Sequence, residues 1–132
     1  MKNVLFALAI ILACASVLPA AAANVPLISK EEVRANLGSP SLLILDLRTR
    51  KQWETSPYKI PGAHWMPKDK VDLWARNLPL NKTILLYCAC DGMGSSGVVA
   101  QELLAKGFSH TCVLDGGWHE WQASGYPLQE RR

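Results

Sequence analysis

The stretch TILLYCACDGMGSSGVVAQELLAKGF, at residues 83–108, decides which fold the sequence predicts. Its apolar run at 84–87 is typical of a strand that is buried on both faces. Cys88 and Cys90 follow this run directly. The next segment, 91–95, is too rich in glycine to be predicted as either helix or strand. The strand is therefore expected to end at a pair of thiols.

The second half of the stretch predicts an amphipathic helix that begins at Ser96 and ends at Gly107. Val99 and Leu103 lie four positions apart and so share one face of this helix. The backbone N–H groups of a first helical turn are unpaired and carry the positive end of the helix dipole, so they favour an anion and lower the pKa of a thiol. A strand that brings a thiol to such a helix end is typical of a nucleophilic cysteine.

Composition and charge indicate one globular domain. The chain has 132 residues, of which 49% are apolar and 19% charged, enough for a single hydrophobic core. Its formal net charge is only +3 and the charged residues are scattered, so a nucleic-acid partner is not expected.

The first 23 residues have the pattern of a secretory signal peptide. Lys2 precedes an apolar run, and Pro19 leads into four alanines at 20–23. We therefore expect a signal peptide at 1–23, a domain at 24–132, and a periplasmic or secreted protein without stable membrane insertion after cleavage.

Two other fates of this segment stay open. An uncleaved apolar run from 4 to 23 is long enough to span a bilayer. Cys14 offers a position for a lipid.

Three cysteines remain after residue 23: Cys88, Cys90 and Cys112. An odd number in an exported protein means that at least one thiol is free, paired between chains or used in chemistry. Two extended residues advance about 6.6 Å, so a disulfide between Cys88 and Cys90 is expected to be strained and easily reduced. Cys112, in an apolar segment, is expected to be a small buried side chain.

Apolar segments alternate with helical patterns along the rest of the chain. This alternation predicts an α/β fold with a central parallel sheet of about five strands and helices on both faces. Strands are predicted at 42–45, 64–66, 84–87 and 111–114, and helices around 29–38, 49–53, 71–76, 96–107 and 118–123.

Three loops are expected to meet at one edge of this sheet. Ligands of parallel sheets bind beyond the carboxyl ends of the strands. Asp46 and Arg48, the segment 88–95 and the segment 115–117 all follow predicted strands. We expect them to form one pocket, which Asp46 and Arg48 shape mainly by fixing neighbouring loops through hydrogen bonds.

Several short motifs resemble, in their order and spacing, those of single-domain rhodaneses. They are DLR at 46–48, IPGA at 60–63, YC at 87–88, KGF at 106–108, LDGGW at 114–118 and GYP at 125–127. The resemblance implies a sulfurtransferase whose cysteine takes a sulfane sulfur from a donor such as thiosulfate, becomes a persulfide and passes the sulfur on. It implies a small sulfur donor, an acceptor that is a thiol or a partner protein, and no cofactor.

The resemblance also implies which residues bind the substrate. Rhodaneses usually have a basic residue at the loop end where this chain has Ser95, and Asp91 adds negative charge. A donor less charged than thiosulfate is therefore expected to suit the site. The expected substrate-binding residues are Asp91, Gly92, Met93, Gly94, Ser95 and Ser96.

The resemblance leaves two choices for the persulfide cysteine. Cys88 directly follows a tyrosine, as the strand-end cysteine of rhodaneses does, whereas counting back from the KGF motif at 106–108 reaches Cys90. Helix N–H groups act on charge only within about the first turn. We therefore assign the persulfide to Cys90 and an auxiliary role to Cys88, with the reverse assignment as the alternative.

Two other functions remain compatible with the sequence. A catalytically silent rhodanese-like module that binds a partner is favoured by the missing basic residue. Alternatively, two thiolates and the thioether of Met93 form a Cys-x-Cys-x-x-Met set that suits Cu(I). His64, His110 and His119 do not have the spacing of metal ligands, so no other metal site is expected.

The pattern of residues 1–23 predicts where the mature protein begins. The mature protein should begin near Ala23 or Asn24 because the alanines there suit a signal peptidase. Amino-terminal sequencing of the exported protein measures this. An intact Met1 in the membrane fraction, or a lipid on Cys14, would contradict it.

Overall fold

The computed structural model describes residues 25–90 and 94–132. The predicted signal peptide at 1–23 lies outside the described residues, and so do Asp91, Gly92 and Met93 of the expected site. The elements are β1 (Leu27–Ile28), α2 (Lys30–Ala35), β2 (Leu42–Asp46), α3 (Arg50–Thr55), β3 (Tyr58–Lys59), β4 (His64–Trp65), α4 (Val71–Trp74), η3 (Ala75–Asn77), β5 (Thr83–Tyr87), α5 (Gly94–Ala105), β6 (Thr111–Leu114), α6 (Gly117–Ala123) and β7 (Gln129–Glu130).

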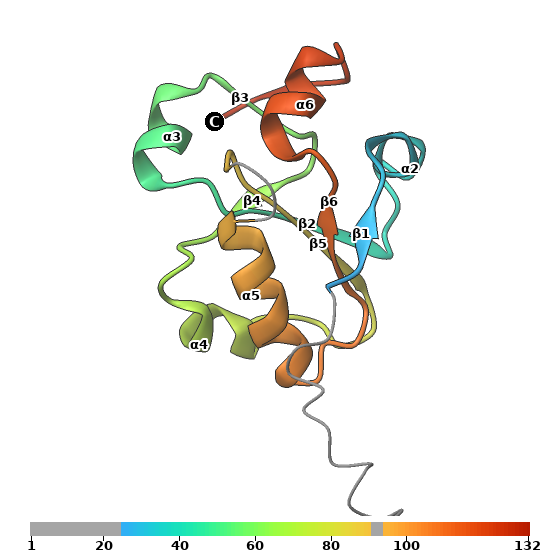
Figure 1. Cartoon of the computed structure of the whole chain (residues 1–132), viewed down its shortest axis with the longest axis vertical. Helices are drawn as coiled ribbons and strands as arrows, with labels where there is room; N and C mark the ends of the chain where they lie inside the picture. Colours follow the sequence, from blue (N-terminus) through green and yellow to red (C-terminus); the bar gives the residue numbers. More distant parts are fainter. Residues whose placement is uncertain (1–24, 91–93) are drawn as a thin grey trace, which may run out of the picture.

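A five-stranded sheet with the order β1-β6-β5-β2-β4 forms the centre of the fold (Figure 1). All of its neighbouring strands are parallel. The predicted α/β fold with a parallel sheet of about five strands is thus confirmed. The sequence did not predict β1, nor the small antiparallel pair of β3 and β7. Strands of two residues are too short for a periodic pattern; β4, equally short, was predicted at 64–66 because a turn precedes it and Pro67 follows it.

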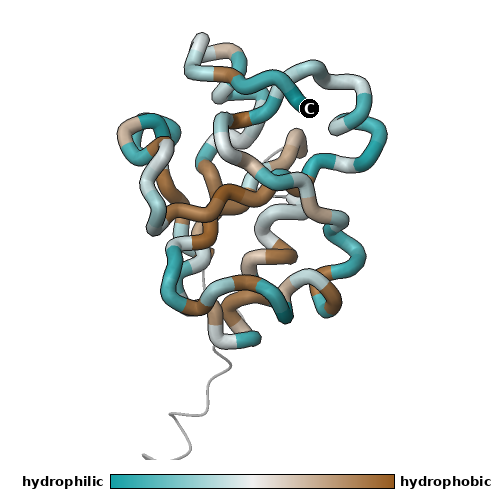
Figure 2. Tube along the Cα trace, turned by 180° about the vertical axis from the view of Figure 1, so that it is seen from behind, coloured by the Kyte–Doolittle hydropathy of each residue, from teal (hydrophilic) through white to brown (hydrophobic). Residues whose placement is uncertain are grey.

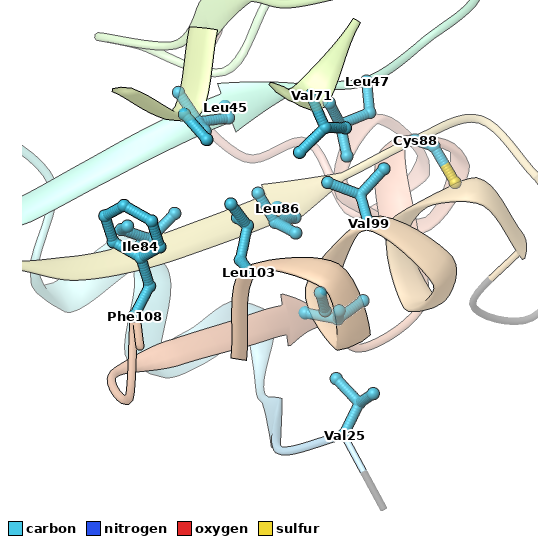
Figure 3. Packing of buried hydrophobic residues seen from close by; sticks show 13 residues of the cluster. Val25, Leu45, Leu47, Val71, Ile84, Leu86, Cys88, Val99, Leu103 and Phe108 are labelled. Carbon is cyan, nitrogen blue, oxygen red and sulfur yellow. The ribbon is translucent and has the colours of Figure 1, made fainter. Parts of the chain in front are cut away.

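Each face of the sheet has its own hydrophobic core, as the apolar strands predict. On one face Val99 and Leu103 of α5 pack against Leu86 of β5, with α4 beside them (Figure 3). On the other face Val33 of α2 and Trp121 of α6 are fully buried. Figure 2 shows hydrophobic residues concentrated along the central strands and polar residues in the peripheral loops.

Helix α5 begins earlier than predicted. Gly94 and Ser95, which the sequence interpretation assigned to the loop, belong to the first turn of α5, so that boundary was wrong. Gly94 has φ +41°, in the left-handed region that glycine adopts readily. The buried Leu103 confirms the predicted apolar face, and Gly107, with φ +97°, follows the helix end.

No helix among residues 25–90 and 94–132 is long and apolar enough to cross a membrane.

Candidate functional site

A buried ion pair lies at the carboxyl edge of the sheet. Arg48 Nη2 is 2.6 Å from Asp46 Oδ2, and both side chains are fully buried. Tyr87, at the end of β5, donates its hydroxyl to the same carboxylate oxygen at 2.6 Å. Burial and the Asp46 charge raise the pKa of Tyr87 well above its usual value. Because Asp46 and Tyr87 are paired in register, this network ties the ends of β2 and β5 together.

The guanidinium of Arg48 also contacts the elements around it. Its Cζ lies 4.3 Å from the ring centroid of Trp118 in α6 and 5.5 Å from that of Trp53 in α3. Its Nη2 donates to the Tyr58 carbonyl at 3.0 Å. Trp65 Nε1 donates to the Arg48 carbonyl at 2.8 Å. These contacts support the expected role of Arg48 in fixing neighbouring loops.

The loop after β6 reaches the same edge. The Trp118 N–H donates to the Cys88 carbonyl at 3.0 Å. A Cβ on Gly117 would lie 2.8 Å from that oxygen, so only glycine permits this approach. The start of α6 thereby holds the backbone of Cys88 in place. Among the described residues, the three loops thus come together as expected, but only the first of them lines the cleft at this edge, so the expectation that they form one pocket stays a prediction.

Both sulfur atoms of the CxC pair lie beside the first turn of α5. A Cβ built on Gly94 would be 2.9 Å from Cys90 Sγ and 3.9 Å from Cys88 Sγ. Cys88 is buried in the core between the end of β5 and the start of α5 (Figure 3), whereas Cys90 is half-buried. Glycine at this position therefore lets the helix begin directly against the Cys90 thiol.

The two thiols have opposite pKa shifts. Burial raises the pKa of Cys88, and hydrogen bonds from Ser96 offset this only in part. Burial also acts to raise the pKa of Cys90, but hydrogen bonds from the Cys88 thiol and from the N–H and hydroxyl of Ser95, together with the charge of Lys68, lower it below its usual value. These directions favour ionisation of Cys90 over that of Cys88.

A cation reaches the start of α5 from a distant segment. Lys68, which lies beyond β4, donates from Nζ to Ser95 Oγ at 3.0 Å. The sequence interpretation sought a basic residue only within the cysteine loop and therefore missed Lys68. Its position just after the predicted strand at 64–66, and so at the carboxyl edge of the sheet, was the available signal for a place near the site, but not for the contact with Ser95.

A cleft of about 350 Å³ lies next to Lys68. Residues 48–50, Trp65 and residues 67–70 line it. The side chains of Arg50 and Lys70 add positive charge on the same wall, where Asp69 is the acidic residue. Because Arg48 is paired with Asp46 and Arg50 with Glu54 at 3.5 Å, the charges of Lys68 and Lys70 stand against that of Asp69 here. The cleft thus favours an anion.

The other expected site residues fall into two groups. Gly94, Ser95 and Ser96 belong to α5, while 91–93 lie outside the described residues. The Cu(I) set, which needs Met93, therefore stays a prediction. Across 25–90 and 94–132, no group of three or more His, Cys, Asp or Glu residues is placed to hold a metal ion. Cys112 lies buried in β6, and this burial raises its pKa to about 11.

Comparisons with known proteins found one matching domain family and several solved structures with a similar fold. The family model of the rhodanese-like domain matches residues 29–124. The crystal structure of the Alr3790 protein from Anabaena sp. is 31% identical, with a TM-score of 0.65, and the match covers 79% of this chain and 82% of that chain. A rhodanese-like domain protein from Staphylococcus aureus is 28% identical, with a TM-score of 0.66, and the match covers 81% and 99%. No curated protein gave a significant match.

The buried ion pair generates a stability prediction. Asp46→Asn should lower the free energy of unfolding by about 3–5 kcal/mol because it leaves the Arg48 charge buried without a counter-charge. The matched control, Glu130→Gln, removes an ion pair with Arg132 whose side chains are 64% and 86% exposed, and it should cost less than about 1 kcal/mol. Urea denaturation measures both. Equal losses in the two variants would show that the buried pair does not stabilise the edge.

Proposed function

Because the chain belongs to the rhodanese-like domain family, we propose that it is a sulfurtransferase that works through a persulfide on Cys90. The observation that carries this proposal is the position of the Cys90 sulfur against the first turn of α5. There the N–H and hydroxyl of Ser95 act together to lower the pKa of Cys90. A lowered pKa makes the thiolate easier to form, and the half-buried Cys90 side chain stays accessible, as attack on a sulfur donor requires.

The proposed reaction has two balanced steps. In the first, the Cys90 thiolate attacks the sulfane sulfur of a donor such as thiosulfate, the sulfur–sulfur bond of the donor breaks, and sulfite leaves with the electron pair. In the second, the thiolate of an acceptor attacks the outer sulfur of the Cys90 persulfide. This attack returns Cys90 to the thiolate and leaves the acceptor as a persulfide. Neither step needs a separate oxidant or reductant.

The first turn of α5 stabilises the charged intermediates. Backbone N–H groups at residues 94–96 lie at the positive end of the helix dipole, which favours both the thiolate and the persulfide anion. Cys88 stays protonated near neutral pH because its pKa is raised, and its thiol hydrogen-bonds to Cys90. We assign Cys88 the auxiliary role of stabilising the Cys90 thiolate and of resolving an oxidised Cys90 through a disulfide.

The partners in this proposal are a small sulfur donor and an acceptor that is a small thiol or a partner protein. If the signal peptide is cleaved as expected, the reaction takes place outside the cytoplasm. A catalytically silent binding module is the competing function, and persulfide formation distinguishes the two.

Intact mass after incubation with thiosulfate, and separately with an organic persulfide, tests the proposal. The unmodified sequence and its Cys88→Ser and Cys112→Ser variants should each gain one sulfur atom from at least one donor. Cys90→Ser should gain none because it lacks the attacking thiolate.

Two results would contradict this account. A Cys90→Ser protein that still gains sulfur, with Cys88→Ser inactive, would reverse the assignment of the two cysteines. No gain by the unmodified sequence with either donor, while circular dichroism shows a folded protein, would favour the silent binding module.

A further inference from the structure

The hydrogen bond between Lys68 and Ser95 has a defined direction. A lysine ammonium group has donors but no acceptor, so Ser95 Oγ accepts in this 3.0 Å contact. The hydroxyl has one hydrogen of its own, and this hydrogen remains available to donate elsewhere. Lys68 thus restricts the rotation of the Ser95 hydroxyl without using its hydrogen.

The hydroxyl hydrogen of Ser95 can be donated to the sulfur of Cys90. Ser95 follows Gly94, whose built Cβ would lie 2.9 Å from Cys90 Sγ, so Ser95 is in the turn that packs against this thiol. The Ser95 hydroxyl and N–H both hydrogen-bond to Cys90. A chain of contacts therefore runs from the Lys68 ammonium through the Ser95 hydroxyl to the Cys90 sulfur.

Among the described residues, few charged or titratable groups act on Cys90 besides Lys68. Cys88 contributes a protonated thiol. Asp46 is compensated by its buried partner Arg48. Asp91 follows Cys90 in the sequence and lies outside the described residues. Lys68 is therefore the cation among the described residues whose charge lowers the pKa of Cys90.

Lys68 also belongs to the wall of the cationic cleft. Arg50 and Lys70 line this cleft with it. Lys68 thus contacts Ser95 in the first turn of α5 and also lines the cleft, whereas no described residue of α5 and neither Cys88 nor Cys90 lines it. A small sulfur anion in the cleft would meet Lys68 next to the helix that holds the thiol.

We propose that Lys68 is a positioning and specificity-determining residue: it orients the Ser95 hydroxyl toward Cys90 and favours anionic sulfur donors, in contrast to the less charged donor that the sequence predicts. The second part of this inference rests on the sulfurtransferase activity proposed above, whereas the first part concerns only the thiol.

The positioning role is tested by the pH dependence of Cys90 alkylation with iodoacetamide, an uncharged reagent, followed residue by residue by mass spectrometry. Lys68→Met and Ser95→Ala should both move the midpoint of the rate profile to higher pH. Lys68→Arg should restore most of the original midpoint because it keeps the charge and the donor. Lys82→Met, the same charge change at the amino end of β5, should leave the midpoint unchanged. An unmoved midpoint in Lys68→Met would overturn the positioning role.

The specificity role is tested by comparing thiosulfate with an uncharged organic trisulfide, RSSSR, supplied together with a small uncharged thiol. Cys90 attacks the central sulfur of the trisulfide and displaces RS⁻; the added thiol then attacks the sulfur that carries R, which leaves the Cys90 persulfide and a disulfide. Lys68→Met should raise the KM for thiosulfate by about tenfold or more, as expected for the loss of a charge-assisted contact, and should change the KM for the trisulfide less than twofold. An equal change for both donors would overturn the specificity role. If the unmodified sequence forms no persulfide, the proposed function and the specificity role fail together, and the alkylation profile still decides the positioning role.

Discussion

The buried ion pair between Asp46 and Arg48 is the interaction on which the functional edge of this domain depends. Charges without access to water are tolerated only when they are paired and hydrogen-bonded, and here this condition constrains several elements at once. The pair needs β2 and β5 in their parallel register so that Tyr87 can donate to the carboxylate. It also places Trp118, at the start of α6, over the guanidinium. The strand end that leads into the cysteines is thereby fixed in position.

Cys88 and Cys90 follow this strand end and are only two residues apart, but they differ in burial and in the direction of their pKa shifts. Cys88 lies in the core, where burial raises its pKa, while Cys90 is partly buried at the margin of the core and lies against the first turn of α5. One pKa unit corresponds to about 1.4 kcal/mol, and a single hydrogen bond to a charged group is worth about 1.5–3 kcal/mol. The hydrogen bond between the two thiols, which lowers the pKa of Cys90 and raises that of Cys88, together with the hydrogen bonds from Ser95 and the smaller effect of the Lys68 charge, therefore distinguishes the two cysteines.

The sequence predicted those features of the fold that repeat along the chain. Apolar strands between helical patterns indicated the parallel sheet, and the four-residue spacing of Val99 and Leu103 indicated the buried face of α5. The start of α5 was placed too late because glycines usually indicate a loop, whereas Gly94 uses its left-handed conformation to begin the helix against Cys90. The contact of Lys68 with Ser95 joins residues far apart in sequence, and no local pattern predicts such a pair.

The central claim is that this edge makes Cys90, and not Cys88, the reactive thiol. Its most direct test is the pH-dependent reactivity of the two thiols in the unmodified, folded protein, measured separately for each residue by differential isotopic labelling. The account predicts that Cys90 becomes reactive at a lower pH than a cysteine in an unfolded peptide and that Cys88 becomes reactive at a higher pH. A lower midpoint for Cys88 than for Cys90, or equal midpoints for both, would contradict it.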